Sequence, residues 1–421
     1  MRLSSVILAI GLLLALAAYL LRDLPPPDQI RFAAGGRDGG YWNIAEQYQE
    51  ILARDGITVE IVETAGSVEN LGLLATDDVD VGLLQGGIPA EGLPINALGT
   101  VLVEPILVFV NKNSSVPANP SLWDGLRIAR GGAGSGTRVA VDELLTRLGV
   151  ADRNELSDLG GEAAGTALLA GALDVAIFVA PVGAEYLKPL YASETVDLLR
   201  LSHTDAISLR LPFSRVATIP SGAISLGPVI PRAAMPTVTL LARLVAVEDL
   251  HPAIVDRLVL AAREIHGENG IFAQQGQFPT TEAVDMPIDA GALKLLIEGQ
   301  SAFHDWLPYW IAAQIRRVLL ILLPLIFLVI PAFQVLPVLY RWTMHRRVWR
   351  HYAEIRKIEL DLTEELDAEA LRGLEKRLAR IDRQLATMRL PPPFRSGAYD
   401  ARLHIELVRR RISEFLGTDA V

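Results

Sequence analysis

Two long apolar runs bracket the chain, at residues 3–21 and 318–340, and neither contains a charged residue. As a helix, each run is long enough to cross a hydrocarbon core of about 30 Å, so the pattern predicts two transmembrane helices. A cleaved signal peptide is the alternative for residues 1–22. We favour an uncleaved anchor over residues 1–24, because the run is long for a signal sequence and no small-residue cleavage site precedes the prolines at 25–27.

Basic residues predict the orientation of these helices. Two arginines precede the second run closely, whereas six basic residues follow it: Arg341, Arg346, Arg347, Arg350, Arg356 and Lys357. This excess places residues 341–421 in the cytoplasm and residues 28–308 in the periplasm of a bacterium, with the inner membrane between them. Arg2, which starts the first run, lies on the cytoplasmic side in the same arrangement.

Between the runs, short apolar segments alternate with segments of helical periodicity. Such alternation is typical of an α/β fold with mostly parallel sheets. The predicted strands are Ile30–Ala34, Ile57–Glu63, Val79–Leu84, Ile106–Val110, Leu126–Ala129, Val175–Ala180 and Val196–Leu201. The predicted helices fall near residues 43–54, 67–76, 137–148, 163–171, 237–247 and 252–266. Residues 73–81 and 168–175 share the order of helix, tight turn with an aspartate and buried strand, which indicates two similar lobes.

Composition narrows the classes of protein. With 421 residues, 51% hydrophobic residues and a formal net charge of −10, we expect a membrane-anchored protein of several domains with a sizeable core. The acidic balance argues against nucleic acid as a partner. The absence of cysteine excludes disulfides, thiol catalysis and cysteine-based zinc or iron–sulfur sites. The seven histidines are scattered without a metal-binding motif, and no hydrolase motif is present, so we expect no enzyme activity, cofactor or metal.

Three glycine- or serine-rich loops each follow a predicted strand and begin a predicted helix, at residues 35–41, 64–70 and 131–137. At each loop, free backbone N–H groups and the positive end of the helix dipole face the carboxyl edge of a sheet, where anions bind. Polar side chains in the second and third loops add hydroxyl and amide groups: Ser67, Asn70, Ser135 and Thr137.

Each loop alone fits an ordinary capped helix, for which Ser67 is a natural N-cap. The third loop resembles a phosphate-binding P-loop, but no lysine precedes Thr137, which argues against nucleotide hydrolysis. Three such loops in one α/β domain instead favour a cleft that binds a carboxylate. Arg37 is a candidate clamp for this group, because a guanidinium binds a carboxylate in a bidentate manner; an exposed loop arginine is the alternative.

The same loops resemble those of a known family, the TAXI-type solute-binding subunits of TRAP transporters. In order, that family has a Gly-Gly-x-Tyr type loop, a Gly-Ser-x-Glu-Asn-Leu segment, an Asp-containing strand ending in Gln, a Glu-Pro-hydrophobic strand and a Gly-x-Gly-Ser-Gly-Thr loop. In this chain the corresponding segments are Gly39–Tyr41, Gly66–Leu71, Asp80–Gln85, Glu104–Ile106 and Gly132–Thr137. Their order and spacing match together over residues 28–305. The chain departs from the family at Arg37-Asp38, where small residues are usual, and at Gly86-Gly87, where an acidic residue is common.

The resemblance implies a type II-like periplasmic-binding-protein fold, in which two α/β lobes close on a solute by a hinge motion. It implies lobe one at residues 28–110 and 215–305 and lobe two at residues 111–212, with crossover strands near 108–115 and 205–220. Ligands of the family are small organic acids such as glutamate or 2-oxoglutarate. Transferred residue by residue, the implied ligand contacts are Gly39, Gly40, Tyr41, Ser67, Asn70, Gln85, Ser135, Gly136 and Thr137.

Beyond the second apolar run, the chain carries two apolar stripes with heptad-like spacing. The first extends from Leu371 to Met388 and the second from Ile405 to Phe415, with Pro391–Pro393 between them. We therefore expect an α-helical cytoplasmic tail over residues 341–421. It forms either an intramolecular hairpin or a dimerising coiled coil, and we favour the hairpin because the first stripe is only a little over two heptads.

These features predict a membrane-anchored periplasmic protein that captures a small organic acid or amino acid between two lobes for a TRAP permease. The alternative is a membrane scaffold or sensor that keeps the binding fold and signals or assembles through its cytoplasmic tail. Backbone N–H groups and hydroxyls accept many carboxylates, so the sequence does not name the solute.

Overall fold

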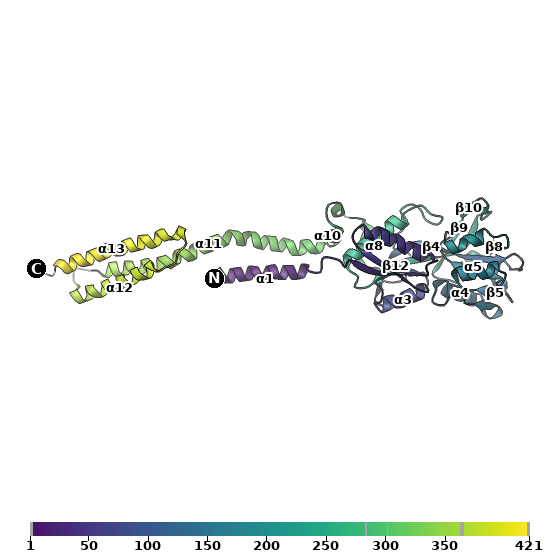
Figure 1. Ribbon diagram of the computed structural model, residues 1–421, viewed down its shortest axis with the longest axis horizontal. Helices are drawn as coiled ribbons and strands as arrows, with labels where there is room; N and C mark the ends of the chain where they lie inside the picture. Colours follow the sequence, from purple (N-terminus) through teal and green to yellow (C-terminus); the bar gives the residue numbers. More distant parts are fainter. Residues whose placement is uncertain (1–2, 283, 301, 363–365, 419–421) are drawn as a thin grey trace. The chain divides into compact units, whose positions relative to one another are not determined.

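The computed structural model describes residues 3–282, 284–300, 302–362 and 366–418, and the chain divides into two compact units. One unit is Asp23–Ile315, and the other combines Met1–Arg22 with Arg316–Val421. The first unit is an α/β domain with two lobes, and the second is entirely helical in its described residues (Figure 1).

The first lobe of the α/β unit is built on three parallel strands in the order β2-β1-β3. These strands are β1 (Gln29–Gly35), β2 (Thr58–Glu63) and β3 (Val81–Gln85). The helices of this lobe are α2 (Gly40–Ala53), α3 (Ser67–Ala75), α8 (Pro252–His266) and α9 (Ala290–Glu298), followed by η4 (Ala302–Asp305) and α10 (Tyr309–Ala312). All five residues of β3 are buried, as expected for a strand covered on both faces.

The second lobe repeats this plan with three parallel strands in the order β6-β5-β7. Its strands are β5 (Arg127–Ala129), β6 (Glu155–Ser157), β7 (Val175–Val179), β8 (Val196–Leu198), β9 (Ser214–Ile219), β10 (Ser225–Leu226) and β11 (Val229–Ile230). Its helices are η1 (Pro120–Leu122), α4 (Gly136–Arg147), η2 (Ala151–Arg153), α5 (Gly161–Leu169), η3 (Glu185–Leu187), α6 (Lys188–Tyr191) and α7 (Thr204–Ser208). Each lobe therefore has its own apolar core, and the two cores share no residue.

Two long antiparallel strands, β4 (Ile95–Asn111) and β12 (Met235–Val247), join the lobes. β4 pairs with β12 up to Pro105 and with β7 from Ile106, while β12 pairs with β9 up to Leu240 and with β3 from Ala242. The chain thus crosses between lobes near residues 105 and 241, outside the expected ranges 108–115 and 205–220. Because both joining strands are antiparallel to their neighbours, the sheet is mixed rather than mostly parallel.

The helix predicted at residues 237–247 is wrong, because this segment is the central strand β12. Twelve of its thirteen residues are buried. A strand buried on both faces does not alternate apolar and polar residues, so its periodicity resembles that of a buried helix. The β-branched residues Thr237, Val238 and Thr239 were the signal for a strand.

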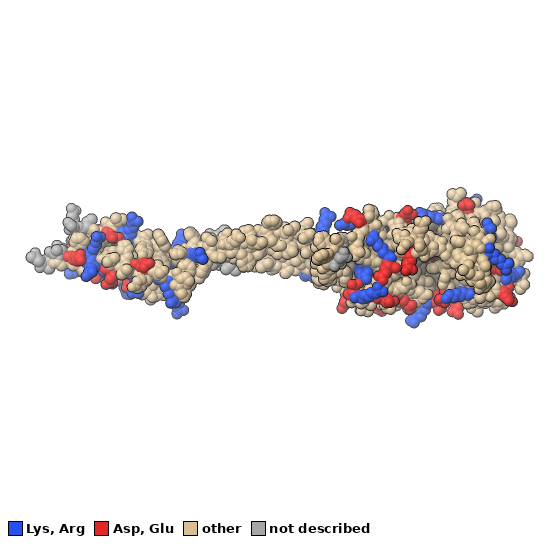
Figure 2. Space-filling model, turned by 90° about the horizontal axis from the view of Figure 1, so that it is seen from above, with Lys and Arg blue, Asp and Glu red and all other residues tan. Residues whose placement is uncertain are grey.

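The helical unit contains α1 (Leu3–Leu21), α11 (Ile315–Asp361), α12 (Ala368–Ala386), η5 (Pro392–Phe394) and α13 (Arg395–Thr418). Among the described helices, α11 is the one long and apolar enough to cross a membrane, while the described side chains of α1 form a shorter apolar helix, Gly11–Leu21. Figure 2 shows an uncharged surface along the apolar part of this unit. The end of α11 shares one apolar core with α12 and α13, so the two predicted stripes pack within a single chain.

Candidate functional site

A cavity of about 600 Å³ lies in the α/β unit, and all three predicted loops line it. Gly35–Gly40 precedes α2, Thr64–Gly66 precedes α3, and Gly131–Ser135 precedes α4. Each loop follows a parallel strand, so the carboxyl edges of both lobes' sheets face the same space. Helix N-termini leave backbone N–H groups without a partner inside the helix, and here three of them border one cavity.

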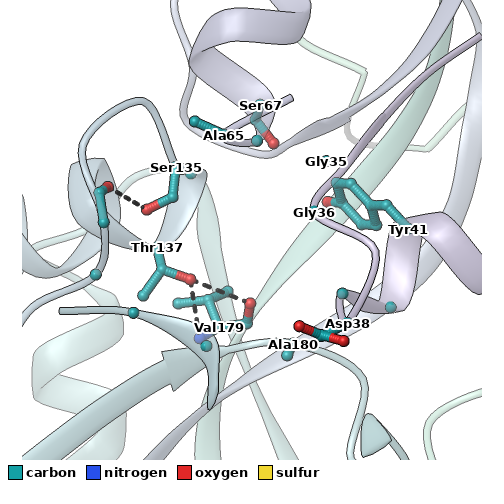
Figure 3. Close-up of a pocket in the computed structure, with 18 of the residues that line it drawn as sticks. Gly35, Gly36, Asp38, Tyr41, Ala65, Ser67, Ser135, Thr137, Val179 and Ala180 are labelled. Atoms are coloured by element: carbon teal, nitrogen blue, oxygen red, sulfur yellow. Dashed lines mark hydrogen bonds between the residues drawn. The ribbon is translucent and has the colours of Figure 1, made fainter. Parts of the chain in front are cut away.

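Nine of the ten predicted ligand contacts line this cavity. They are Arg37, Gly39, Gly40, Tyr41, Ser67, Gln85, Ser135, Gly136 and Thr137. Figure 3 shows Tyr41 and Ser67 on one side of it and Ser135 and Thr137 on the other. The tenth, Asn70, is not among the lining residues.

Asn70 is fully buried beneath the second loop. Its Nδ2 donates to the carbonyl oxygens of Leu83 at 2.9 Å and Ala33 at 3.3 Å, and its Oδ1 accepts from the Thr64 hydroxyl at 2.5 Å. The amide therefore ties β1, β3 and the Thr64 turn together. Asn70 supports the loop from behind and does not offer its side chain to the cavity.

Arg37 lies at the rim of the cavity and already has a carboxylate partner. Its Nε donates to Glu63 at 2.9 Å, and its guanidinium lies 5.0 Å from the centre of the Trp42 ring. The side chain is 70% exposed. This placement is that of an exposed loop arginine engaged with its own lobe.

Direct hydrogen bonds connect the two lobes at the cavity. The Gln85 amide of lobe one donates to the Gly136 carbonyl of lobe two at 2.9 Å, and the Val68 N–H donates to the Gly134 carbonyl at 3.1 Å. The Ser67 hydroxyl in turn accepts from the Gln85 N–H at 3.0 Å. Gln85 thus joins the lobes as well as lining the cavity.

Glycine is required at Gly136, where α4 begins. A Cβ added there would lie 2.9 Å from the Cβ and Oε1 of Gln85. Contacts this short are not tolerated, so a side chain would push the lobes apart. The close approach of the two lobes therefore depends on the missing side chain.

The two hydroxyls of the third loop both bond to backbone groups within lobe two. Ser135 caps α4 by accepting from the Arg138 N–H at 3.1 Å, and it donates to the Gly132 carbonyl at 2.7 Å. Thr137 lies 3.4 Å from the backbone of Val179 (Figure 3). These bonds fix the loop so that its remaining N–H groups are held in a defined arrangement.

Glu104, which was not among the predicted ligand contacts, lines the cavity. Glu104 lies on β4 beside the crossing between lobes and is 2% exposed. The Tyr41 hydroxyl donates to its Oε2 at 2.7 Å. Burial raises the pKa of Glu104 to about 8, despite the hydrogen bond from Tyr41 that opposes this shift. Burial and the neighbouring Glu104 raise the pKa of Tyr41 well above its usual value.

A fourth loop, Gly160–Ala163 at the start of α5, also lines the cavity and was missed. It holds the position in lobe two that the Thr64 loop holds in lobe one. The repeat of helix, aspartate and strand at residues 73–81 and 168–175 was the available signal, because it makes α5 the counterpart of α3. Phe178, Pro181 and Tyr186 complete the apolar part of the lining.

The family model described as the NMT1-like family matches residues 32–261. No curated protein matches the chain.

Three of the similar solved structures are two sulfonate-binding proteins and a protein in complex with methylphosphonate. The periplasmic aliphatic sulphonate-binding protein of Escherichia coli is 16% identical, with a TM-score of 0.38, over 57% of this chain and 73% of that one. The alkanesulfonate-binding protein of Xanthomonas axonopodis pv. citri, bound to MOPS, is 17% identical, with a TM-score of 0.39, over 57% and 74%. PhnD1 of Prochlorococcus marinus, in complex with methylphosphonate, is 14% identical, with a TM-score of 0.39, over 57% and 84%.

The family match covers β1 to α8, which includes both lobes, the joining strands and every loop around the cavity. The two-lobed arrangement with two joining strands is the periplasmic-binding-protein-like fold. The chain therefore belongs to the NMT1-like family, with a periplasmic-binding-protein-like α/β unit followed by a helical one.

Proposed function

We propose that this protein is a membrane-anchored solute-binding protein that captures a small organic anion in the interlobe cavity for a TRAP-type transporter. One observation carries the proposal: four helix N-terminal loops, two from each lobe, border a single cavity. Helix N-termini favour anions through their unbonded N–H groups and their dipoles. A site divided between two lobes also suits capture by hinge closure.

The resemblance to TAXI-type subunits supports the choice of transporter. Its motif segments at Gly39–Tyr41, Gly66–Ser67, Gln85, Glu104 and Gly132–Thr137 all contribute residues to the cavity lining. We retain Gly39, Gly40, Tyr41, Ser67, Gln85, Ser135, Gly136 and Thr137 as proposed ligand contacts. Asn70 becomes a supporting residue, and Arg37 a rim residue.

Membrane attachment is proposed from the apolar length of α11 and the basic residues that follow its apolar part. In this arrangement the α/β unit is periplasmic and the end of α11, with α12 and α13, is cytoplasmic. Residues 1–24 serve as a second anchor. Tethering keeps the binding unit close to a permease in the same membrane and raises its effective concentration there.

The test is ligand-induced stabilisation of the full chain in detergent micelles. The panel contains acetate, succinate, 2-oxoglutarate and glutamate, and a solute at about 100 times its Kd stabilises the native state by about 2.7 kcal/mol. We expect at least one of these to raise the melting temperature of the α/β unit. The matched control is Gly136→Leu, whose side chain would push the two lobes apart at Gln85 and should abolish the rise. If no compound of the panel raises the melting temperature of the wild-type chain, the proposed binding function is contradicted.

The sensor or scaffold alternative is favoured by one feature, the well-packed cytoplasmic helices. Ile358 of α11, Leu378 of α12 and Ile405 of α13 are each at most 1% exposed in a shared core. A tether alone does not need such a domain. Deletion of residues 345–421 separates the two functions, because uptake of the solute by cells survives this deletion only if the tail is dispensable for transport.

A further inference from the structure

Glu104 occupies an unusual position for an acidic residue in a cavity that we propose binds anions. It lies on β4 two residues before the segment that pairs with β7 of lobe two, and it is 2% exposed. It also lines the cavity. A solute in this cavity can therefore come close to this carboxyl group.

The surroundings of Glu104 provide a hydrogen-bond donor but little positive charge. From α2, the Tyr41 hydroxyl donates to Oε2 at 2.7 Å. From η3, Tyr186 faces it as a second neutral phenol, and burial raises the pKa of Tyr186 above its usual value. From β12, Arg243 donates to the Gln85 carbonyl at 3.0 Å and forms an ion pair with Asp285. Arg243 thus directs its Nη2 to Gln85 and its charge to Asp285, while its Nε makes no hydrogen bond within the described residues.

The other charges at the cavity do not compensate an ionised Glu104. Among the described lining residues, Arg37 is the one lysine or arginine, and it is bonded to Glu63. Asp38 and Glu162 add further negative charge to the lining. An ionised Glu104 would therefore be a buried anion without a cationic partner, which is costly. Consistent with this, burial raises its pKa to about 8.

We propose that Glu104 acts as a neutral carboxylic acid that donates its proton in a hydrogen bond to the anionic group of the solute. One carboxyl oxygen accepts from Tyr41, and the other carries the proton toward the solute. The neutral acid adds a donor to those of the four loops, whereas the ionised acid would repel the anion. This inference rests on the proposed function, and it makes Glu104 a specificity-determining residue that favours an anion over a cation.

The inference predicts a pH dependence with a definite sign. Below the pKa of Glu104 the carboxyl group is already protonated and can donate to the anion. Above this pKa, Glu104 must take up one proton with each anion that binds. Affinity should therefore fall about tenfold between about pH 7 and about pH 9. Over the same range, proton uptake on binding should rise from near zero toward one.

The experiment is isothermal titration calorimetry of the full chain in detergent, in buffers of different ionisation enthalpy. The probe is whichever of acetate, succinate and 2-oxoglutarate binds most tightly, and glutamate is titrated beside it. Glu104→Gln keeps a weaker donor, so we expect affinity about fivefold lower at about pH 7 and independent of pH. Glu104→Leu removes the donor and should lower affinity about a hundredfold at every pH. The matched control Glu162→Gln removes another acid from the same cavity and should keep the wild-type slope.

A second readout needs no solute. The infrared difference spectrum between the wild-type chain and Glu104→Gln at neutral pH should contain the C=O stretch of a protonated carboxyl group. Its absence would overturn the inference.

The opposite calorimetric result would overturn it as well. If affinity rises with pH, and Glu104→Gln loses glutamate binding but not binding of the nitrogen-free probe, then Glu104 is an anion that holds an ammonium group. In that case the proposed solute binding is supported, and only the proposed role of Glu104 is contradicted. If no probe binds the wild-type chain, the proposed function itself fails.

Discussion

The two lobes build their halves of the cleft with the same unit and secure it with the same pair of residues. In lobe one, Arg31 on β1 donates to Asp80 from its backbone N–H at 2.6 Å and from Nη2 at 3.1 Å. In lobe two, Arg127 on β5 donates to Asp174 from its N–H at 2.9 Å and from Nη2 at 2.9 Å. In each lobe the aspartate precedes the third strand, so the pair fixes that strand beside the first.

The difference between these two pairs lies in burial and in one extra bond. Asp174 also accepts from the Ser114 hydroxyl at 2.6 Å, and its side chain is 13% exposed compared with 23% for Asp80. The bonds from Arg127 and Ser114 lower the pKa of Asp174. The comparison shows that one sequence pattern produces the same geometry twice, while the surrounding residues decide how strongly it stabilises each lobe.

The largest expected effect is loss of the more buried aspartate. We expect Asp174→Ala to reduce the free energy of unfolding by about 3 kcal/mol and Asp80→Ala by about 2 kcal/mol. The loss is larger for Asp174 because its removal leaves more hydrogen-bond donors without an acceptor, and because the site is more buried. Urea unfolding of the full chain, followed by tryptophan fluorescence, measures both. An equal or larger loss for Asp80→Ala would contradict the comparison.

The lowered pKa of Asp174 predicts how this stabilisation depends on pH. The unfolded-state pKa is near 3.8, so the contribution is fully present above this value and is lost as pH falls through the lower folded-state pKa. Relative to Asp174→Asn, the wild-type chain should be about 2 kcal/mol more stable at about pH 6, and the gap should shrink below about pH 4. Acid titration of both chains at fixed urea concentration tests this, and a gap that widens in acid would be the wrong sign.

A third prediction compares the helix starts at which each lobe approaches the other. A Cβ on Gly136 would meet the Cβ of Gln85 at 2.9 Å, whereas one on Gly40 would meet ring atoms of Pro181 at 3.1 Å and 3.2 Å. We expect Gly136→Ala to weaken solute binding about tenfold and Gly40→Ala about threefold, because the Pro181 ring can yield more easily. Gly72→Ala, with open space around its Cβ position, is the control on α3. Calorimetry of the three variants measures whether a side chain at the start of α4 weakens solute binding more than one at the start of α2.

The extra bond in lobe two gives a smaller effect. Ser114→Ala removes the hydroxyl donor to Asp174 and should cost about 1 kcal/mol of unfolding free energy. It should also bring the stabilities of the Asp174 and Asp80 pairs closer together. Urea unfolding of the double variant with Asp174→Ala provides the control, since the two losses should not add.

The smallest effect is expected at the rim. Arg37 and Glu63 are 70% and 52% exposed, so Arg37→Ala should change the unfolding free energy by less than about 0.5 kcal/mol. Affinity for the solute should change less than in Gly136→Ala. A tenfold loss of affinity would restore Arg37 as a carboxylate clamp.

Local signals identified most of the elements and loops in advance. Predicted strands such as Ile30–Ala34 and Val175–Ala180 nearly coincide with β1 and β7, and α8 has the predicted bounds 252–266. These features depend on the residues within them and just before them: apolar runs, helix caps and glycines. The cap that Ser135 forms on α4 is predictable for the same reason, because its hydrogen bond spans only three residues.

The amino-acid sequence by itself determined the apolar runs, the repeated unit of each lobe and the helix N-termini that follow their strands, because each arises from neighbouring residues. Tertiary structure decided that β12 lies at the centre of the sheet, that Asn70 turns inward and that Glu104 lines the cavity. Each of these outcomes depends on contacts between residues far apart in the chain, such as Asn70 with Leu83 or Glu104 with Tyr41. Burial and hydrogen bonding of this kind are settled only when segments distant in the chain pack together, and no local pattern encodes them.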